Sequence, residues 1–595
     1  MKRLLQLLTL TVGILCSIQS VHAQYPDYQQ ALLNERVGFG RNATGGAGGE
    51  VYWVTNLNES GPGSLRQACE QDDNARWILF AVNGTINLSN PIQVHSNKTI
   101  DGRGASITLT SQGLWIVGLD KNGVLNGSRN VIVENLTLSN GVDFRDGVMI
   151  QEGAGDVWVD HCSFSNWPYH NALDISTPRA SIFSDVTISW CKFSNQNFVM
   201  LIGGFAGDAN GPNMRVTLHH NYFLQTGQRN PRIRKALVHA YNNYLYDWQQ
   251  SEGGMATSDS GQLRTEYNIF DGISNDEAIT VTAPPEPPGF SYPTNNFTLH
   301  GAYVTAYNPN GVFSPSSYYS YTTEATDYTL VVNIQTLSGA TRTSGRLVNM
   351  STRANVQGGQ GVLISGFTIS GSPSDSKRVI IRAIGPSLSP WFPNAMGNPT
   401  LDIYNVYGQV IHSNDNWGDY QYNEIVATGL APSNYLEAAW VGYLSPGTYS
   451  AAINGWGTGI AVLEIYDLQA SAPAKLVNIS SRATVDPNNP PFAGFIAQSG
   501  WTKLIIRGIG PSLAQFGIQN PISDPTLTMY DANGTQIAYN NNWQDAPSGV
   551  SQLGFAPSDS REAVIVTNLA PGSYTVMLRD YYNYSGIGSI EMYKF

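Results

Sequence analysis

The chain has 595 residues, too many for one hydrophobic core, and its composition is typical of an extracellular protein rich in β structure. Only 13% of the residues are charged, about half the usual share for a soluble protein, whereas glycine (60) and tyrosine (31) are abundant. The formal net charge of -12 argues against general affinity for nucleic acid. It would also repel an acidic polymer, so binding one requires local cations or a bridging metal.

The N-terminal segment, 1–23, resembles a secretory signal peptide. Lys2 and Arg3 precede an apolar run from Leu4 to Ile18, and the segment ends in Val21-His22-Ala23. This pattern predicts cleavage after Ala23 and a secreted, periplasmic or cell-surface protein. No later apolar run reaches the ~18 residues needed to cross a bilayer.

One strand signature recurs along the first half of the chain. It occurs at His161-Cys162-Ser163-Phe164, Trp190-Cys191-Lys192-Phe193, His220-Asn221-Tyr222-Phe223, Asn242-Asn243-Tyr244-Leu245 and Tyr267-Asn268-Ile269-Phe270. The second residues of successive copies are separated by intervals between the low twenties and thirty. A period of this size, with short alternating strands, is typical of stacked parallel strands. The sequence therefore predicts an all-β chain in which residues 24–340 form a right-handed parallel β-helix.

The second position of the signature predicts an interior ladder. Equivalent side chains on neighbouring coils lie about 4.8 Å apart, so interior asparagines can hydrogen-bond from coil to coil. Asn135 extends this ladder by one further period upstream of Cys162. Cys162 and Cys191 occupy neighbouring rungs, and they either form a disulfide or stack as buried thiols. Stacked thiols are favoured, because side chains in a ladder point in parallel.

A cluster of cations follows one of these strands. It reads Arg229-Asn230-Pro231-Arg232-Ile233-Arg234 and continues to Lys235, an R-x-P-x-x-R pattern. Proline stiffens the loop, so the arginines can be held facing a polyanion in a groove. The cluster predicts a site for an acidic polymer.

The C-terminal part of the chain changes character and repeats itself. The string that begins at Leu347 returns at Leu476, and the string that begins at Ile380 returns at Ile505. Short alternating strands between turn signals predict two tandem antiparallel β-sandwiches, residues 346–470 and 475–595. The matching Asn-rich loops before Trp417 and Trp543 suit calcium or sugar, but a turn that caps a core tryptophan is the favoured interpretation.

Several strings resemble polysaccharide lyase family 1, the pectate and pectin lyases. They are GPGSLRQA at 61–68, VWVDH at 157–161, ALDIS at 172–176, VTISW at 186–190, VTLHHNYF at 216–223, RNPRIR at 229–234 and VHAYNNYLYDW at 238–248. Their order and spacing follow the family from residue 38 to about 340. The two C-terminal repeats are similar to a module appended to large secreted bacterial proteins.

The resemblance implies a lyase that cuts plant cell-wall polygalacturonate by β-elimination, assisted by calcium. Arg229 would be the base, and Arg234 would grip a substrate carboxylate. The residues expected to bind substrate or metal beside them are Arg232, Lys235 and Phe198 for substrate, and Asp146, Asp174 and His170 for calcium. Asp160, His161, His219 and His220 belong to family strings, but we expect them to be structural.

Departures from the family pattern keep other functions open. His170 stands where pectate lyases place a third acidic calcium ligand, Val148 where some have a further aspartate, and Phe198 where a substrate-binding lysine is common. Each change removes charge, which favours a calcium-independent pectin lyase acting on methyl-esterified chains. A non-catalytic polysaccharide-binding or adhesion protein is a third alternative, although it would have no need for both Arg229 and Arg234.

Overall fold

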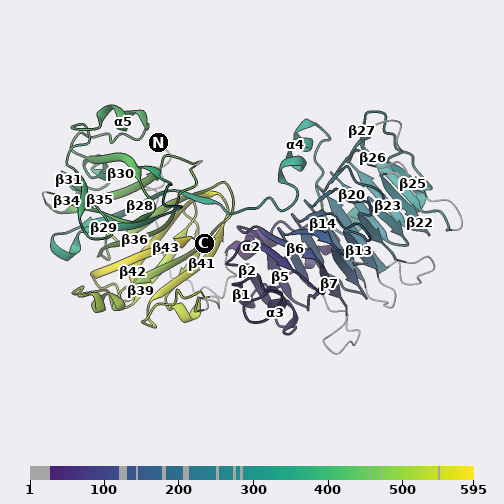
Figure 1. Ribbon diagram of the computed structural model, residues 1–595, viewed down its shortest axis with the longest axis horizontal. Coiled ribbons are helices and arrows are strands. Elements are labelled where there is room, and N and C mark those ends of the chain that lie inside the picture. Colours follow the sequence, from purple (N-terminus) through teal and green to yellow (C-terminus); the bar gives the residue numbers. More distant parts are fainter. Residues whose placement is uncertain are drawn as a thin grey trace. The chain divides into compact units, whose positions relative to one another are not determined.

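The structure is a computed structural model that describes residues 27–118, 130–142, 145–176, 183–204, 213–248, 254–272, 277–281, 286–455, 457–470, 472–546, 550–551 and 553–594. The expected signal peptide, residues 1–23, lies outside these ranges. Within them, no helix is both long enough and apolar enough to cross a membrane. Two compact units divide the chain, one spanning Gln29–Thr343 and the other containing Ser344–Phe595 (Figure 1).

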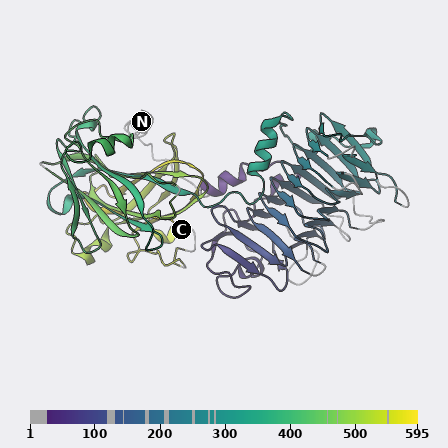
Figure 2. The ribbon, with the colours of Figure 1, turned by 45° about the horizontal axis from the view of Figure 1, so that its top comes forward.

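The first unit is a coil of parallel strands that forms three sheets (Figures 1 and 2). Sheet A contains β1 (Glu50–Val54), β2 (Arg76–Phe80), β5 (Lys98–Asp101), β8 (Val131–Glu134), β11 (Val157–Asp160), β14 (Ser184–Ser189), β17 (Met214–His219), β20 (Leu237–Tyr241), β23 (Gln262–Glu266) and β26 (Phe290–Thr294). Sheet B contains β3 (Gly84–Asn87), β6 (Ile107–Ser111), β9 (Thr137–Gly141), β12 (Ser163–Ser165), β15 (Lys192–Ser194), β18 (Tyr222–Leu224), β21 (Tyr244–Tyr246), β24 (Ile269–Asp271) and β27 (Phe297–Leu299). Sheet C contains β4 (Ile92–Gln93), β7 (Leu114–Val117), β10 (Val148–Gln151), β13 (Leu173–Ser176), β16 (Met200–Ile202), β19 (Arg232–Arg234), β22 (Met255–Ser258) and β25 (Ile279–Val281). The parallel β-helix predicted from the strand signature is confirmed.

Helices are short and lie outside the coil of strands. In this unit they are α2 (Asp27–Leu33), η2 (Phe39–Asn42), α3 (Leu65–Glu70), η5 (Pro309–Gly311), η6 (Pro315–Ser317) and α4 (Tyr328–Leu337). Ser64 caps α3 by accepting from the Gln67 amide, and Asp327 caps α4 by accepting from two amides of its first turn.

The recurring signature marks the corner between sheets A and B. Its first residue takes the left-handed backbone conformation, with φ between 47° and 57° at Asn135, His161, Trp190, His220, Asn242, Tyr267 and Asn295. Its second residue points inward, where asparagines form the predicted ladder. Asn221 donates through Nδ2 to Asn243 Oδ1, and Asn243 donates in the same way to Asn268 Oδ1, both at 2.9 Å. Each rung therefore satisfies a buried amide through the next coil.

The upstream end of the ladder differs from the sequence alignment by one residue. Ser163 pairs with Thr137, so Cys162 lies opposite Leu136 and not opposite Asn135. Asn135 is instead the corner residue, and its Nδ2 donates to the carbonyl oxygen of Gly102 at 2.8 Å. The difference arises because asparagine suits both a left-handed corner and an interior rung.

The three cysteines of the described ranges, Cys69, Cys162 and Cys191, are buried and unpaired. Stacked thiols on neighbouring rungs, the favoured alternative, are thus what the structure shows. Phe164, Phe193 and Phe223 form a second stack in sheet B, with successive ring centres 5.1 Å apart. A continuous column of buried side chains runs through these coils.

The second unit is built from antiparallel strands of both sequence repeats. The first repeat supplies β28 (Arg346–Val356), β29 (Leu363–Ser370), β30 (Lys377–Ile384), β31 (Pro399–Tyr404), β32 (Val410–Asn414), β33 (Ala438–Leu444), β34 (Gly447–Gly455) and β35 (Gly459–Asp467). The second supplies β36 (Lys475–Val485), β37 (Phe492–Gln498), β38 (Thr502–Ile509), β39 (Pro525–Tyr530), β40 (Gln536–Asn540), β41 (Ala563–Leu569), β42 (Gly572–Asp580) and β43 (Gly586–Lys594). Its helices are η7 (Gly359–Gly361), η8 (Pro386–Leu388), α5 (Tyr422–Ala427), η9 (Pro511–Phe516) and η10 (Trp543–Asp545).

The two repeats exchange strands and do not form separate units. β28 of the first repeat pairs with β37 of the second, and β36 of the second pairs with β29 of the first. One run of strands is therefore β33-β30-β35-β28-β37-β42-β39-β40, and its counterpart is β41-β38-β43-β36-β29-β34-β31-β32. Asn355 pairs with Thr484 across the two runs, and side chains of both repeats share one hydrophobic core. The expected boundary between residues 470 and 475 thus falls inside one compact unit.

The repeated motifs of this unit have structural roles. The Asn414 Oδ1 accepts from the Ala439 amide at 2.9 Å, and Asn540 Oδ1 accepts from the Val564 amide at 2.8 Å. Both loops before the tryptophans are thereby tied to a neighbouring strand. This favours the turn interpretation over a calcium or sugar site.

Candidate active site

The predicted functional residues gather along sheet C and the turns that lead into it. Asp174 on β13 points out of the coil, because its neighbours Leu173 and Ile175 are buried in the core. Strand pairing sets Asp174 beside Leu201 on β16, and Leu201 beside Arg232 on β19. Three coils thus bring side chains that are far apart in sequence to one outer face.

Asp146 is the centre of a hydrogen-bonded group in the turn before β10. Its Oδ1 accepts from His170 Nδ1 at 2.8 Å, from the Asn171 backbone amide at 2.8 Å and from Asn171 Nδ2 at 2.9 Å. The bond to Asp146 raises the pKa of His170, so the imidazole keeps its proton to a higher pH than usual. The sequence predicts His170 as a calcium ligand; in the structure its Nδ1 is hydrogen-bonded to Asp146.

Asp174 carries the most perturbed carboxyl of this face. Burial, followed by the charge of Asp146, raises the pKa of Asp174 to about 7. Its Oδ1 accepts from Ser176 Oγ at 2.9 Å. A buried carboxyl whose ionisation is opposed by a neighbouring carboxylate favours the binding of a cation beside it.

Arg229 lies in the turn before β19 and is fixed from two sides. Its Nη1 donates to Asn171 Oδ1 at 2.8 Å, and its guanidinium carbon lies 4.5 Å from the ring centre of Phe198. The Arg229 backbone is left-handed, with φ at 64°, a conformation that costs an ordinary residue about 1–2 kcal/mol. Asn171 thus links Arg229 to Asp146 through one side chain, and Phe198 is a support for Arg229.

Arg232 and Arg234 hold a carboxylate of the chain itself. Glu286 accepts from Arg234 Nε at 3.1 Å and from Arg234 Nη2 at 2.9 Å, and Arg232 Nη2 lies 3.5 Å from Glu286 Oε2. The hydrogen bonds from Arg234 are the main reason why the pKa of Glu286 falls to about 2. Ser258 Oγ donates to the same carboxylate at 2.6 Å. Lys235, the last cation of the cluster, has its Nζ 3.8 Å from Asp259 Oδ2.

Sequence reasoning missed Asn171 and Glu286. Asn171 directly precedes ALDIS but has no pattern of its own that predicts a bond to Arg229. Glu286 does carry a signal: it is the one acidic residue in Ala283 to Gly289, and prolines flank it on both sides. A carboxylate on such a stiff segment is positioned for a specific partner.

A second buried group of acids has the composition of a metal site but behaves as an ion network. Ligand atoms of Glu134, Asp160 and His161 lie within 4.8 Å of one another. Arg342 already neutralises them, with Nη1 3.1 Å from Glu134 Oε1, and His161 Nδ1 donates to Asp160 Oδ2 at 2.6 Å. The expected structural role of Asp160 and His161 agrees with these contacts.

The same part of the chain resembles known proteins. A family model described as Pectate lyase matches residues 38–343. Putative pectate lyase 21 of Arabidopsis thaliana is 33% identical over 270 residues, which cover 43% of this chain and 66% of that protein. Probable pectate lyase 18 of Arabidopsis thaliana is 31% identical over 322 residues (49% of this chain, 75% of that protein), and Pectate lyase 1 of Chamaecyparis obtusa is 31% identical over 277 residues (44% and 72%).

Among solved structures, jun a 1, the major allergen from cedar pollen, aligns with 52% of this chain and 93% of its own, at 24% identity and a TM-score of 0.44. That likeness is too distant to add to the argument. The family model alone spans just over half of the 595 residues, from 38 to 343, and it covers the whole row of site residues from Asp146 to Glu286. The chain therefore belongs to the pectate lyase family and is a polysaccharide lyase.

Proposed function

We propose that the protein is a secreted pectate lyase that cleaves α-1,4-polygalacturonate by calcium-assisted β-elimination and releases 4,5-unsaturated oligogalacturonides. The observation that carries this proposal is the link from Arg229 through Asn171 to Asp146, on the same face as Asp174. This link supports the proposal because the elimination needs a base beside a bound cation.

The chemistry follows from the acidity of the substrate. The proton on carbon 5 of a uronic acid unit is held tightly while the adjacent carboxylate keeps its charge. Arg229, after its guanidinium has given up a proton to solvent, accepts this proton; the electron pair forms the double bond between carbons 4 and 5, and the glycosidic oxygen on carbon 4 departs and takes up a proton from water. Asn171 and Phe198 keep the guanidinium in one place, so little conformational freedom is lost in the reaction.

Asp146 and Asp174 fit calcium by their donor chemistry. Calcium prefers carboxylate oxygens, and burial together with the charge of Asp146 leaves the ionised form of Asp174 disfavoured even beside His170, which a bound cation would relieve. When bound, calcium supplies charge that neutralises the substrate carboxylate. We assign His170 to orienting Asp146 and not to the metal, because its Nδ1 is already committed to that carboxylate.

Glu286 favours one alternative, a pectin lyase acting on methyl-esterified chains. With Glu286 in place, Arg232 and Arg234 already have a carboxylate partner and gain less from one on the substrate. Esterified substrates lack that carboxylate.

The role of residues 344–595 in binding carbohydrate or a surface stays a prediction. Tyr581 and Tyr582 are exposed, with ring centres 5.1 Å apart, and are suited to stacking on sugar rings.

The deciding experiment follows the ultraviolet absorbance of the unsaturated product, with the full mature chain on polygalacturonate and on highly methylated pectin. Each substrate is tested with calcium and with a chelator. We expect a calcium-dependent rise on polygalacturonate. A calcium-independent rise that is larger on methylated pectin would assign the protein as a pectin lyase, and no rise on either would leave binding as its role.

Glu286 should compete with the substrate for the arginines. Replacing it with glutamine keeps the shape and removes the charge, so KM for polygalacturonate should fall about fivefold while kcat changes less than about twofold. Steady-state kinetics at fixed calcium measure both constants. Glu324→Gln, which removes the same charge beside His220, is the matched control. A rise in KM would mean that Glu286 positions Arg234 for the substrate.

A further inference from the structure

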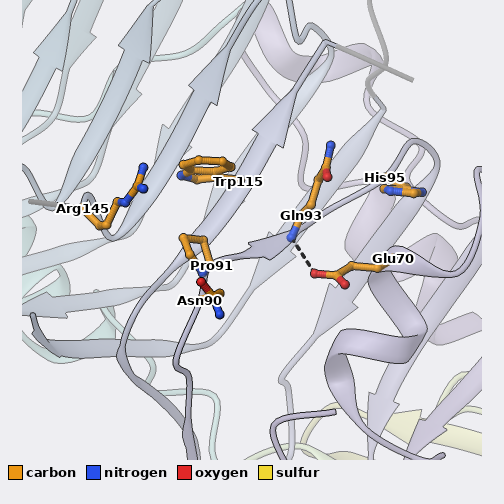
Figure 3. Close-up of a pocket in the computed structure, with 7 residues that line it drawn as sticks. All are labelled: Glu70, Asn90, Pro91, Gln93, His95, Trp115 and Arg145. Atoms are coloured by element: carbon orange, nitrogen blue, oxygen red, sulfur yellow. Dashed lines mark hydrogen bonds between the residues drawn. The ribbon is translucent and has the colours of Figure 1, made fainter. Parts of the chain in front are cut away.

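A pocket of about 590 Å³ lies on the β-helix at the N-terminal end of sheet C. Its lining includes Gln93 on β4, Trp115 on β7 and Arg145, which comes just before β10 (Figure 3). The candidate active site uses none of these three side chains. The pocket is therefore a separate feature of the same sheet.

Strand pairing aligns the pocket with the candidate active site. Gln93 pairs with Trp115, Trp115 with Met149, and Met149 with Asp174. These side chains project from the same face, because Leu114 and Ile116 on either side of Trp115 are buried in the core. Neighbouring strands are about 4.8 Å apart, so Trp115 and Asp174 are separated by about 10 Å along the sheet. A polysaccharide chain that crosses the strands from Asp174 reaches Trp115 within a few sugar units.

The side chains of the pocket suit an acidic sugar. The Arg145 guanidinium carbon lies 5.1 Å from the ring centre of Trp115, which is half-buried. An indole face packs against the C–H face of a sugar ring, and a guanidinium binds a carboxylate through two parallel hydrogen bonds. The Trp115 Nε1 atom is itself buried, so it is the face of the indole that a ligand meets.

The acidic residue of the pocket is already neutralised. Glu70 Oε1 accepts from Arg66 Nη1 at 2.7 Å and from the Gln93 backbone amide at 3.0 Å, the second bond being drawn in Figure 3. Arg145, by contrast, is exposed. The charge that a ligand meets beside Trp115 is consequently positive, which favours an anionic sugar over a neutral one.

We infer that Trp115 and Arg145 form a distal subsite that binds one uronic acid unit of the polysaccharide, away from the bond that is cleaved. The inference rests on the proposed function for the course of the substrate along sheet C. Binding energy from such a subsite holds long chains in place and contributes nothing to short ones that end before reaching it.

The test compares Trp115→Ala and Arg145→Gln with the unsubstituted full chain on polygalacturonate and on oligogalacturonides of increasing length. KM on the polymer should rise about tenfold in each variant, with kcat within about twofold. KM of the unsubstituted protein should fall as the oligomers lengthen, and in both variants it should stop falling at a shorter length. Tyr292→Ala is the matched control, since Tyr292 stacks with Arg264 on sheet A at 4.2 Å.

Binding of polygalacturonate, measured by calorimetry on the Arg229→Lys protein, separates this inference from the proposed function. If the unsubstituted protein does not cleave polygalacturonate but Trp115→Ala still weakens binding about tenfold, the proposed function fails and the subsite stands. If cleavage occurs and both variants bind the polymer as tightly as the unsubstituted chain, the subsite is overturned. Circular dichroism confirms that the variants are folded, and Arg145→Gln, an exposed change, serves as the check should Trp115→Ala unfold.

Discussion

Replacing Arg229 with lysine should lower kcat on polygalacturonate by about 100-fold to 10,000-fold, the range by which a positioned base accelerates a proton transfer. Lysine keeps the positive charge but lacks the planar guanidinium that donates to Asn171 and stacks on Phe198. KM should therefore change by less than about threefold, because the charge that attracts the substrate is retained. Initial rates of unsaturated product give both constants.

Arg215→Lys provides the comparison for this change. Arg215 on β17 is also partly buried and also packs on an aromatic ring, with its guanidinium carbon 4.0 Å from the ring centre of Phe183, but it belongs to sheet A. Its replacement should leave kcat unaltered. If Arg229→Lys kept more than about a tenth of the activity, another group would have to be the base.

In a chelator at pH 8, Asp174→Asn should melt at a temperature roughly 2–5 °C higher than the unsubstituted protein, although it loses calcium-dependent activity. Burial and Asp146 raise the pKa of Asp174 from 3.8 to about 7. A carboxyl with a raised pKa costs stability as the pH rises from its unfolded value toward its folded value, and the cost is complete above about 7. Asparagine removes this cost while still accepting from Ser176.

The same substitution should have almost no effect at pH 4, where the folded protein already holds Asp174 in its neutral form. Calorimetry at pH 4 and pH 8, each with and without calcium, measures the four melting temperatures. Calcium should raise the melting temperature of the unsubstituted protein at pH 8 and leave that of Asp174→Asn unchanged. Equal calcium stabilisation of both proteins would place the cation elsewhere.

The sequence predicted the coil of strands because its signal is local and repeated. Each corner needs a residue that tolerates a left-handed backbone, followed by an inward residue that the next coil can satisfy, and this pair recurs from His161 to Asn268. At Asn135 the prediction was wrong by one position: asparagine suits both the corner and the interior rung, and Asn135 is the corner residue. Asp146, Asp174 and Arg229 could be proposed as site residues from the sequence because short motifs surround them, and the fold brings them to one sheet.

Long-range contacts could not be read from the sequence. Glu286 meets Arg234 from a distant part of the chain, and only the fold brings this carboxylate to the arginines. Repeats of similar sequence also give no indication of which copy of a strand will pair with which. β28 accepts β37 of the other repeat as an antiparallel neighbour, because the copies of that strand share the same apolar pattern.

The exchange of strands between the repeats also dictates when this part of the protein can fold. β28 cannot gain its neighbour β37, nor β29 its neighbour β36, until the second repeat has left the ribosome. Contacts so distant in sequence close slowly, because the intervening chain must first be brought together. During synthesis the first repeat therefore has an unpaired strand edge, and exposed edges of this kind pair readily with other chains. Chaperones that keep the nascent chain unfolded until its last strand is made would protect it during this interval.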